Sequence, residues 1–192
     1  MYVKFFKRFF DFIFSLIAVV VLSPVLLALI IVGAVAMRGN PFFVQPRPGK
    51  KGKDGQEKIF KLVKFRTMDN RKDKDGNLLP DDVRLNKYGK IMRITSLDEL
   101  PELINILKGD MSIVGPRPAL PREVEQYSAY QAQRLFITPG LTCYWQIQPN
   151  RNDISFDEWV EMDIQYIRER SFLVDWKIIF KTIIAVLTKQ GR

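Results

Sequence analysis

The chain is organised around the stretch Ile94-Thr-Ser-Leu-Asp-Glu-Leu-Pro-Glu-Leu-Ile-Asn-Ile-Leu-Lys108. It places two adjacent carboxylates, Asp98 and Glu99, at the predicted start of a helix, where the positive end of the helix dipole favours the ionised form of an acid. Ser96 and Glu99 have the spacing of a capping box. Pro101 is tolerated only near a helix start, so Asp98 is the alternative cap. Taken alone, the pair is most simply interpreted as two capping residues.

The composition excludes several kinds of active site. The 192 residues contain no His and a single Cys, Cys143, which excludes Ser-His-Asp and Cys-His catalysis, structural zinc and disulfides. Acid–base or nucleophilic chemistry would therefore fall to Asp, Glu, Lys, Tyr, Ser or Thr. The net charge of +9 indicates a polyanionic partner, which could be nucleic acid, anionic lipid or a phosphorylated substrate.

A retained membrane segment is predicted near the N-terminus. The run Phe12–Met37 holds no charged residue and exceeds the roughly 20 residues that cross a bilayer. Ser23-Pro24 lies near its middle, where proline removes a helical hydrogen bond and the Ser hydroxyl can satisfy a freed backbone group. Positive charges flank both ends, which favours a re-entrant helix–break–helix on the cytoplasmic side over a kinked spanning helix.

The remainder of the chain is predicted to be α+β and dominated by helices. The pattern predicts a hairpin between Phe42–Gln45 and Lys58–Phe65, with Gly49–Gly55 as its tip. The helix ending in Lys189 carries one apolar face and is either interfacial on an anionic membrane or core-facing. Helices are predicted over Val83–Met92, Pro121–Phe136, Phe156–Arg170 and, for this last helix, Leu173–Lys189. A short strand is predicted over Met111–Val114, and a short strand or extended piece over Tyr144–Ile147.

Four cations could neutralise a diphosphate beside the acidic pair. Lys64 and Arg66 end a predicted strand, although a charged strand edge is the alternative. Arg93 precedes the acidic stretch, and Arg117 stands between two prolines that fix its backbone for a bidentate grip on phosphate. Taken alone, the Pro-flanked Arg117 would be interpreted as an ordinary turn with an exposed Arg.

Together these groups predict phosphoryl-type transfer at a membrane face, between a soluble nucleotide substrate and a lipid acceptor. Two adjacent carboxylates can bind Mg²⁺, which prefers oxygen ligands and substrate phosphates. A carboxylate can also attack phosphorus to give an acyl phosphate. Neighbouring cations are expected to hold that carboxylate ionised at neutral pH.

The chain resembles the bacterial sugar transferase family, the small monotopic polyprenyl-phosphate phosphoglycosyl transferases. The resemblance runs nearly from end to end, with many motifs in one order. The matching residues are Lys7–Phe12, Ser23-Pro24, Lys64–Met68, Arg93 with Thr95–Pro101, Leu107–Ser112, Gly115–Pro118, Pro139–Thr142 and Arg151–Asp153.

This resemblance implies an enzyme of the bacterial inner (cytoplasmic) membrane. It would move a sugar 1-phosphate from a UDP-sugar to polyprenyl (undecaprenyl) phosphate and release UMP, as the first membrane step of glycoconjugate or polysaccharide biosynthesis. Residues 1–38 would be a re-entrant membrane helix broken at Ser23-Pro24. Residues 39–192 would be a compact catalytic domain on the cytoplasmic face, with amphipathic interfacial helices around it and membrane lipids as partners.

The resemblance also implies roles for individual residues. Asp98 would be the nucleophile that takes the phospho-sugar, and Glu99 would help to bind Mg²⁺ with Asp98 or orient the pair. The implied phosphate-binding cations are Lys64, Arg66, Arg93, Arg117 and Arg151. One loop departs from the family pattern, because Cys143-Tyr-Trp145 follows Thr142 where the family often has Gly, and Pro149-Asn150 precedes Arg151.

Two other functions explain part of the pattern. A non-enzymatic membrane anchor with a basic face for anionic lipid or nucleic acid would explain the charge and the apolar run, but it leaves the acidic pair and Arg117 without a purpose. A transferase that moves a whole sugar with a carboxylate base would release UDP instead of UMP. With the phosphoglycosyl transferase preferred, no nucleic-acid partner is expected.

Overall fold

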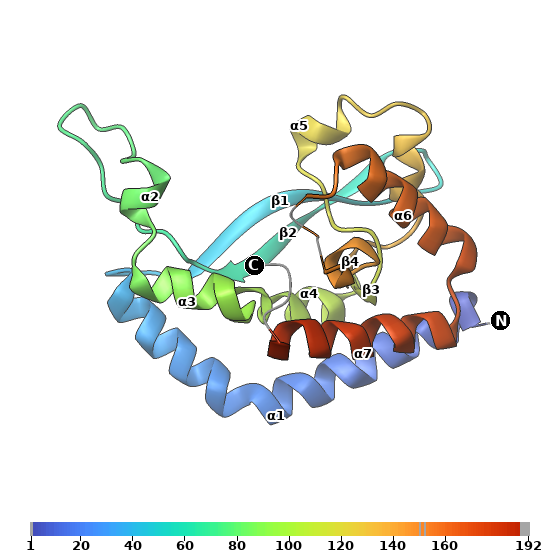
Figure 1. Cartoon of the computed structure of the whole chain (residues 1–192), viewed down its shortest axis with the longest axis horizontal. Coiled ribbons are helices and arrows are strands. Elements are labelled where there is room, and N and C mark those ends of the chain that lie inside the picture. The colour runs from blue at the N-terminus through green and yellow to red at the C-terminus, as the bar shows by residue number, and fades with distance from the viewer. Residues whose placement is uncertain (1, 150, 152, 189–192) are drawn as a thin grey trace.

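The computed structural model describes residues 2–149, 151 and 153–188. After a short 3₁₀ turn, η1 (Tyr2–Lys4), the helix α1 (Phe6–Ala36) runs along one whole side of the molecule (Figure 1). Among the described residues it is the only helix both long and apolar enough to cross a membrane. Its buried residues are few, namely Asp11, Ser15 and Gly33. Many of its large apolar side chains are exposed, which is typical of a surface that contacts lipid or a partner.

The helix α1 is continuous through Pro24 but bends near its middle (Figure 1). Proline has no N–H for the carbonyl of Val20, and the hydroxyl of Ser23 donates to that oxygen instead, at 2.8 Å. The predicted compensation by serine is thereby confirmed. The predicted helix–break–helix is a bent, unbroken helix in this structure, and its re-entrant topology stays a prediction.

The predicted hairpin is confirmed and is longer than expected. Strand β1 (Phe42–Lys51) pairs antiparallel with β2 (Glu57–Phe65), and the rings of Phe42 and Phe65 stack with their centroids 5.5 Å apart. Strand β1 continues through Pro46 and Pro48, which a two-stranded sheet tolerates because each strand has a free edge. In Figure 1 the hairpin passes between the side of α1 and that of α5 and α6.

Two helix predictions were wrong because side chains cap the backbone part-way. The segment predicted over Val83–Met92 forms α2 (Asp81–Arg84) and α3 (Lys87–Thr95), since Asn86 caps α3 by accepting from the N–H of Gly89. The segment over Pro121–Phe136 forms α5 (Pro121–Val124) and the 3₁₀ helix η3 (Gln131–Phe136). There the side chains of Ser128 and Gln131 each accept the other's backbone N–H and start a new turn.

A second small sheet was only half predicted. Strand β3 (Ser112–Val114) was expected, but it pairs in parallel with β4 (Gly140–Thr142), and the predicted strand Tyr144–Ile147 is the 3₁₀ helix η4 (Trp145–Ile147). Gly140 permits this pairing, because a Cβ there would lie 2.1 Å from the backbone nitrogen of Gly115. The strand β3 thus leads directly into the Pro-flanked Arg117.

The core lies between the hairpin, α1 and α4 (Glu102–Lys108). Its buried side chains are Phe60, Leu62, Leu103, Ile106 and Met111, against which Ala18, Val19 and Leu22 of α1 pack. Polar bonds also tie α1 to this body. Asp11 accepts from the hydroxyl of Ser112 and the N–H of Ile113, and Arg8 donates to the carbonyls of Ile106 and Leu107 at the end of α4.

Helix α6 (Phe156–Glu169) begins after the cap Ser155, whose side chain accepts from the N–H of Glu158. Helix α7 (Phe172–Thr188) follows and lies beside the N-terminal half of α1, where Phe10 contacts Phe172 and Phe14 contacts Trp176 (Figure 1). The predicted apolar face of α7 is largely uncovered: Trp176, Phe180, Ile183, Ile184 and Leu187 are exposed. An interfacial position suits this face and stays a prediction, and Lys189 lies outside the described residues.

Candidate active site

The acidic pair occupies η2 (Leu97–Glu99), a single 3₁₀ turn between α3 and α4. Ser96 ends α3 in the left-handed conformation, with φ 54°, and its backbone N–H bonds back into α3. The predicted capping box is wrong, because the Ser96 side chain makes no cap bond. The carboxylate of Glu99 instead accepts from Lys64 Nζ at 2.8 Å and Arg117 Nη2 at 2.9 Å, and such charge-assisted bonds are stronger than a cap.

The pair borders a hollow of about 410 Å³, here named the cationic hollow. Six of the predicted site residues line it together with Ile94 and Ser96: Lys64, Arg93, Asp98, Glu99, Arg117 and Arg151. Lys64 comes from the end of β2, and Arg93 from the last turn of α3, where its Nε donates to the hydroxyl of Thr67 at 3.1 Å. Tertiary folding therefore gathers cations that are far apart in the sequence around Asp98.

Arg66 is the predicted site residue that the fold does not bring there. Its backbone N–H bonds to the carbonyl of Pro41 at 2.7 Å, just beyond the paired strands. Arg66 is not one of the described residues that line the cationic hollow. A phosphate-binding role for Arg66 is therefore not supported by its position.

Glu102 belongs to this cluster and was missed from the sequence. It is the first residue of α4, is 3 % exposed, and its Oε1 lies 3.0 Å from Nζ of Lys64. Lys64 thus bridges two carboxylates, those of Glu99 and Glu102. The signal was present, because residues three apart on a helix share a face and Glu102 follows Glu99 at that spacing.

Burial and neighbouring charges give the carboxyl groups of Asp98, Glu99 and Glu102 different pKa shifts. Burial opposes ionisation of Glu99, but Arg117 and Lys64 overcome it and lower its pKa to about 2. Burial raises the pKa of Glu102 to about 7, with Lys64 acting against it. Burial, and then the charge of Glu99, also raise the pKa of Asp98. The cations therefore dominate the pKa of Glu99, whereas at Asp98 burial and the charge of Glu99 outweigh the lowering by Lys64 and Arg117. Ionisation of Asp98 at neutral pH stays a prediction.

Magnesium fits this site only with help from a substrate. Carboxylate oxygens of Asp98 and Glu99 are of the kind that Mg²⁺ prefers. Within residues 2–149, 151 and 153–188, however, no group of three His, Cys, Asp or Glu side chains could enclose a metal ion. Lys64 and Arg117 already engage one oxygen of Glu99. Phosphate oxygens would have to supply the remaining ligands.

A second hollow, of about 260 Å³, adjoins the cationic hollow and shares Ser96, Glu99 and Arg151 with it. Most of its lining is apolar and comes from two sources. Helix α7 supplies Ile179, Ile183, Ala185 and Val186, and the body supplies Leu97, Leu100, Ile113 and Leu141. Glu99 of the acidic pair and helix α7 therefore border the same apolar hollow.

The departing loop supports Arg117. Its Cys143 and Trp145 are buried, and burial raises the pKa of the Cys143 thiol far above its usual range. The Arg117 guanidinium lies 6.0 Å from the centroid of the Trp145 ring, which in turn stacks on Trp159. Asn150, at the end of this loop, lies outside the described residues.

Comparison with known proteins agrees with this geometry. The family model described as bacterial sugar transferase matches residues 2–189. The chain belongs to the bacterial sugar transferase family. Among its relatives in this family, the uncharacterized sugar transferase EpsL of Bacillus subtilis is 43 % identical over 96 % of this chain and 89 % of its own length.

Longer members of the bacterial sugar transferase family also match nearly the whole chain. The galactosyl transferase CpsE of Streptococcus agalactiae is 40 % identical over 96 % of this chain. The undecaprenyl-phosphate galactose phosphotransferase of Salmonella typhimurium is 35 % identical over 98 % of it. The matched segments are 43 % and 42 % of those two proteins, so the chain spans less than half of their length.

Proposed function

We propose that this protein transfers a sugar 1-phosphate from a UDP-sugar to undecaprenyl phosphate or a similar polyprenyl phosphate. The observation that carries the proposal is the setting of Asp98. Its half-buried carboxylate has no ion pair with any described residue, and it lies in a hollow lined by Lys64, Arg93, Arg117 and Arg151. A dianionic diphosphate matches that lining, and the free carboxylate is placed to react with it.

In the proposed first step, a carboxylate oxygen of Asp98 attacks the phosphorus that carries the sugar. An acyl-phosphate bond forms, the bond from that phosphorus to the bridging diphosphate oxygen breaks, and UMP leaves with the electron pair. The cations Lys64, Arg93, Arg117 and Arg151 offset the charge on the phosphate oxygens. Mg²⁺ held by Asp98, Glu99 and substrate phosphate would supply further neutralisation of that charge.

In the second step, a phosphate oxygen of the lipid attacks the same phosphorus and frees Asp98. The apolar hollow beside α7 suits the first part of a polyprenyl chain, since its lining is aliphatic and reaches Glu99. The exposed apolar surface of α1 suits membrane lipids, which agrees with a re-entrant, monotopic enzyme whose catalytic domain lies on the cytoplasmic face of the bacterial inner membrane.

Names of relatives support the substrate classes. The Salmonella typhimurium relative is named for undecaprenyl phosphate and galactose. Another, 33 % identical over 97 % of this chain, is the UDP-N-acetylgalactosamine-undecaprenyl-phosphate N-acetylgalactosaminephosphotransferase of Aeromonas hydrophila. The two names share a lipid acceptor and differ in the sugar, so we propose the UDP-sugar class as donor.

The test is the intact mass of the purified protein after mixing with Mg²⁺ and each of a panel of UDP-sugars, without lipid. We expect a mass gain equal to one sugar phosphate with one donor, and its loss in Asp98→Asn. Asp82→Asn is the matched control, because Asp82 is exposed on α2, away from the hollow, and it should keep the adduct.

Other outcomes would select the alternatives. Release of UMP on adding polyprenyl phosphate without any adduct would mean direct transfer and would remove Asp98 as nucleophile. Release of UDP would indicate transfer of the whole sugar. Neither nucleotide from any donor would favour the non-enzymatic anchor.

A further inference from the structure

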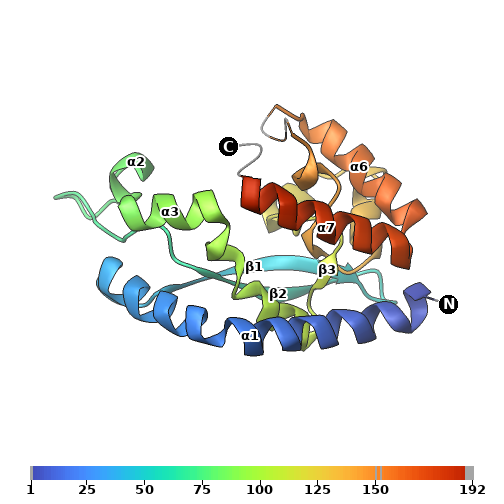
Figure 2. The same cartoon turned by 60° about the horizontal axis from the view of Figure 1, so that its bottom comes forward.

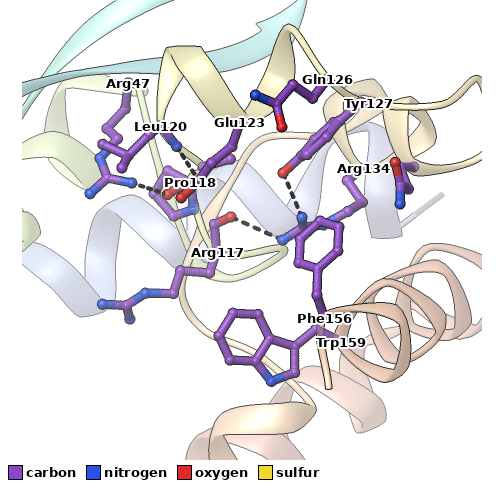
Figure 3. Close-up of a pocket in the computed structure, with 12 residues that line it drawn as sticks. Arg47, Arg117, Pro118, Leu120, Glu123, Gln126, Tyr127, Arg134, Phe156 and Trp159 are labelled. Carbon is purple, nitrogen blue, oxygen red and sulfur yellow. Dashed lines mark hydrogen bonds between the residues drawn. The ribbon is translucent and has the colours of Figure 1, made fainter. Parts of the chain in front are cut away.

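A third hollow, of about 520 Å³, opens on the other side of Arg117. Figure 3 shows its lining: Arg47 and the Arg117 guanidinium stand at one end, and Phe156 and Trp159 at the other. We name it the aromatic hollow. Its volume is in the range of about 300–1,000 Å³ that small-molecule sites occupy. Of the residues that line it, only Arg117 has a role in the reaction proposed above.

The aromatic walls of this hollow are held in place. The ring of Trp159 stacks on that of Trp145, with centroids 4.3 Å apart and planes within 17°. Arg134 is buried, donates to Asp163 at 2.8 Å and to the hydroxyl of Tyr127 at 2.7 Å, and lies within 6 Å of the Tyr127 and Phe156 rings. Rigid aromatic surfaces of this kind suit a planar ring, because stacking then orders few side chains.

The hollow also offers polar groups that match a base edge. The side-chain amide of Gln126 lines it and makes no hydrogen bond within the described part of the chain. An amide presents a donor and an acceptor side by side, and the imide edge of uracil presents the complementary pair. Phe156, 41 % exposed, leaves an aromatic surface available beside it.

Arg117 joins this hollow to the reacting carboxylate. It lines both the aromatic and the cationic hollows, and its Nη2 lies 2.9 Å from Glu99, the neighbour of Asp98. A diphosphate held over Arg117 would therefore have one end toward Asp98 and the other toward Trp159 and Phe156.

The two hollows that flank the cationic one differ in chemistry and in the side of the molecule they face. The apolar hollow is built on α7, beside α1. The aromatic hollow is built from α5, η3 and the start of α6, which lie on the side away from α1 in Figures 1 and 2. A water-soluble group would enter from that side, and a lipid from the other.

We infer that the aromatic hollow binds the uridine half of the donor, with uracil stacked on the exposed ring of Phe156, beside which Trp159 stands edge to face, and with its edge on Gln126. This inference rests on the proposed function, since it takes a uridine nucleotide as the donor. The main competitor is the sugar half, because aromatic faces also stack on sugars. The two assignments predict different results for UMP, which lacks the sugar. If the hollow binds uridine, the affinity for UMP depends on these residues, and if it binds the sugar, that affinity does not.

The test measures the Kd of UMP by calorimetry with the full chain in detergent. Phe156→Ala and Gln126→Ala should each weaken UMP binding, the first on the order of tenfold or more because a base–aromatic contact is lost. Phe136→Ala is the matched control: it removes an exposed Phe of η3 that does not line the hollow, and it should leave the Kd unchanged. The rate of adduct formation in Phe136→Ala should likewise stay within about threefold of wild type, since both the aromatic and the cationic hollows keep their lining.

Unchanged UMP affinity in folded Phe156→Ala and Gln126→Ala would overturn the inference. A change in the relative rates with different UDP-sugars, without a change in UMP affinity, would overturn it in favour of the sugar. If wild-type protein forms an adduct and the substitutions leave the Kd of UMP unchanged, only the uridine assignment is refuted. Wild-type protein that forms no adduct and binds no UMP would refute the proposed function as well. If Phe156→Ala fails to fold, Gln126→Ala decides.

Discussion

At the scale of single residues, five positions of one stretch hold three carboxylates in three different electrostatic settings. Glu99 has two cationic partners and a lowered pKa, and Glu102 is buried with a raised pKa. The pKa of Asp98 is also raised, and no cation among the described residues bonds to it. Of the three carboxylates, that of Asp98 is the one without an ion pair to a described residue. The difference comes from Lys64 and Arg117, which the fold supplies from elsewhere in the chain.

Replacing Arg117 by Lys tests the planar guanidinium. Arg117→Lys should lower kcat/KM for the UDP-sugar by about 10- to 100-fold, because an ammonium cannot hold Glu99 and a phosphate in one bidentate plane. Arg122→Lys, the same change at an exposed position of α5, is the control in a UMP-release assay. A loss below threefold in Arg117→Lys would mean that only the charge of Arg117 matters.

Replacing Glu102 by Gln tests the buried carboxyl. The folded pKa of Glu102, about 7, lies above its ordinary value of 4.5, so the stability that its protonated form provides is complete below about pH 4.5 and is lost as the pH rises through 7. Gln cannot ionise, and Glu102→Gln should therefore gain stability relative to wild type between pH 5 and pH 8. Melting temperatures in detergent at several pH values measure this, and a difference that does not vary with pH would contradict it.

At the scale of elements, α1 sets the relation between the protein and the membrane. Its 31 residues would measure about 46 Å if straight, more than the roughly 30 Å of a hydrocarbon core. Pro24 leaves the Val20 carbonyl to the hydroxyl of Ser23 and lets the helix bend. A bend near the middle is what a helix needs to return to the side from which it entered.

Cysteine labelling tests the re-entrant path. Val3→Cys and Lys53→Cys place thiols before and after α1, and both should react with a membrane-impermeant maleimide only from the cytoplasmic side. The native Cys143 is buried, so the unmodified chain serves as the blank. In Pro24→Leu the Val20 carbonyl regains a backbone N–H, and we expect the two sites to label from opposite sides. Labelling from opposite sides already with Pro24 present would show a spanning helix.

At the scale of the whole molecule, α1 and α7 together present apolar side chains next to each other, and the cationic hollow lies beside the apolar hollow that α7 helps to build. This arrangement separates the two proposed half-reactions. The donor would need only the water-facing side, whereas the acceptor would need α7 against the membrane.

A charge on α7 should therefore affect only the lipid step. Phe180→Glu replaces a side chain that is 64 % exposed. It should lower transfer to polyprenyl phosphate at least tenfold, because a charge is costly at a lipid surface, while adduct formation from the UDP-sugar stays near wild type. Leu78→Glu, a matched change at an exposed position between β2 and α2, should alter neither step. Equal losses in both steps would show that Phe180 supports the catalytic body instead.

Local pattern was enough to predict several elements. The apolar run, its Ser-Pro bend, the hairpin and the amphipathic last helix each depend on residues near one another in the chain, so hydrophobic period and side-chain size reveal them. The divided helices around Asn86 and Ser128 were not predicted, because there short polar side chains compete with the helix for backbone N–H groups.

The sequence by itself determined that the chain has a long apolar helix, an acidic pair, several cations and no histidine chemistry. Only the tertiary structure decided which of these groups meet. It brought Lys64 from β2 and Arg117 from the loop after β3 onto Glu99, left Arg66 outside, and buried Glu102 under Lys64. The physical reason is that the energy of a charge depends on its burial and its nearest partners, and both are fixed by contacts between residues distant in the sequence.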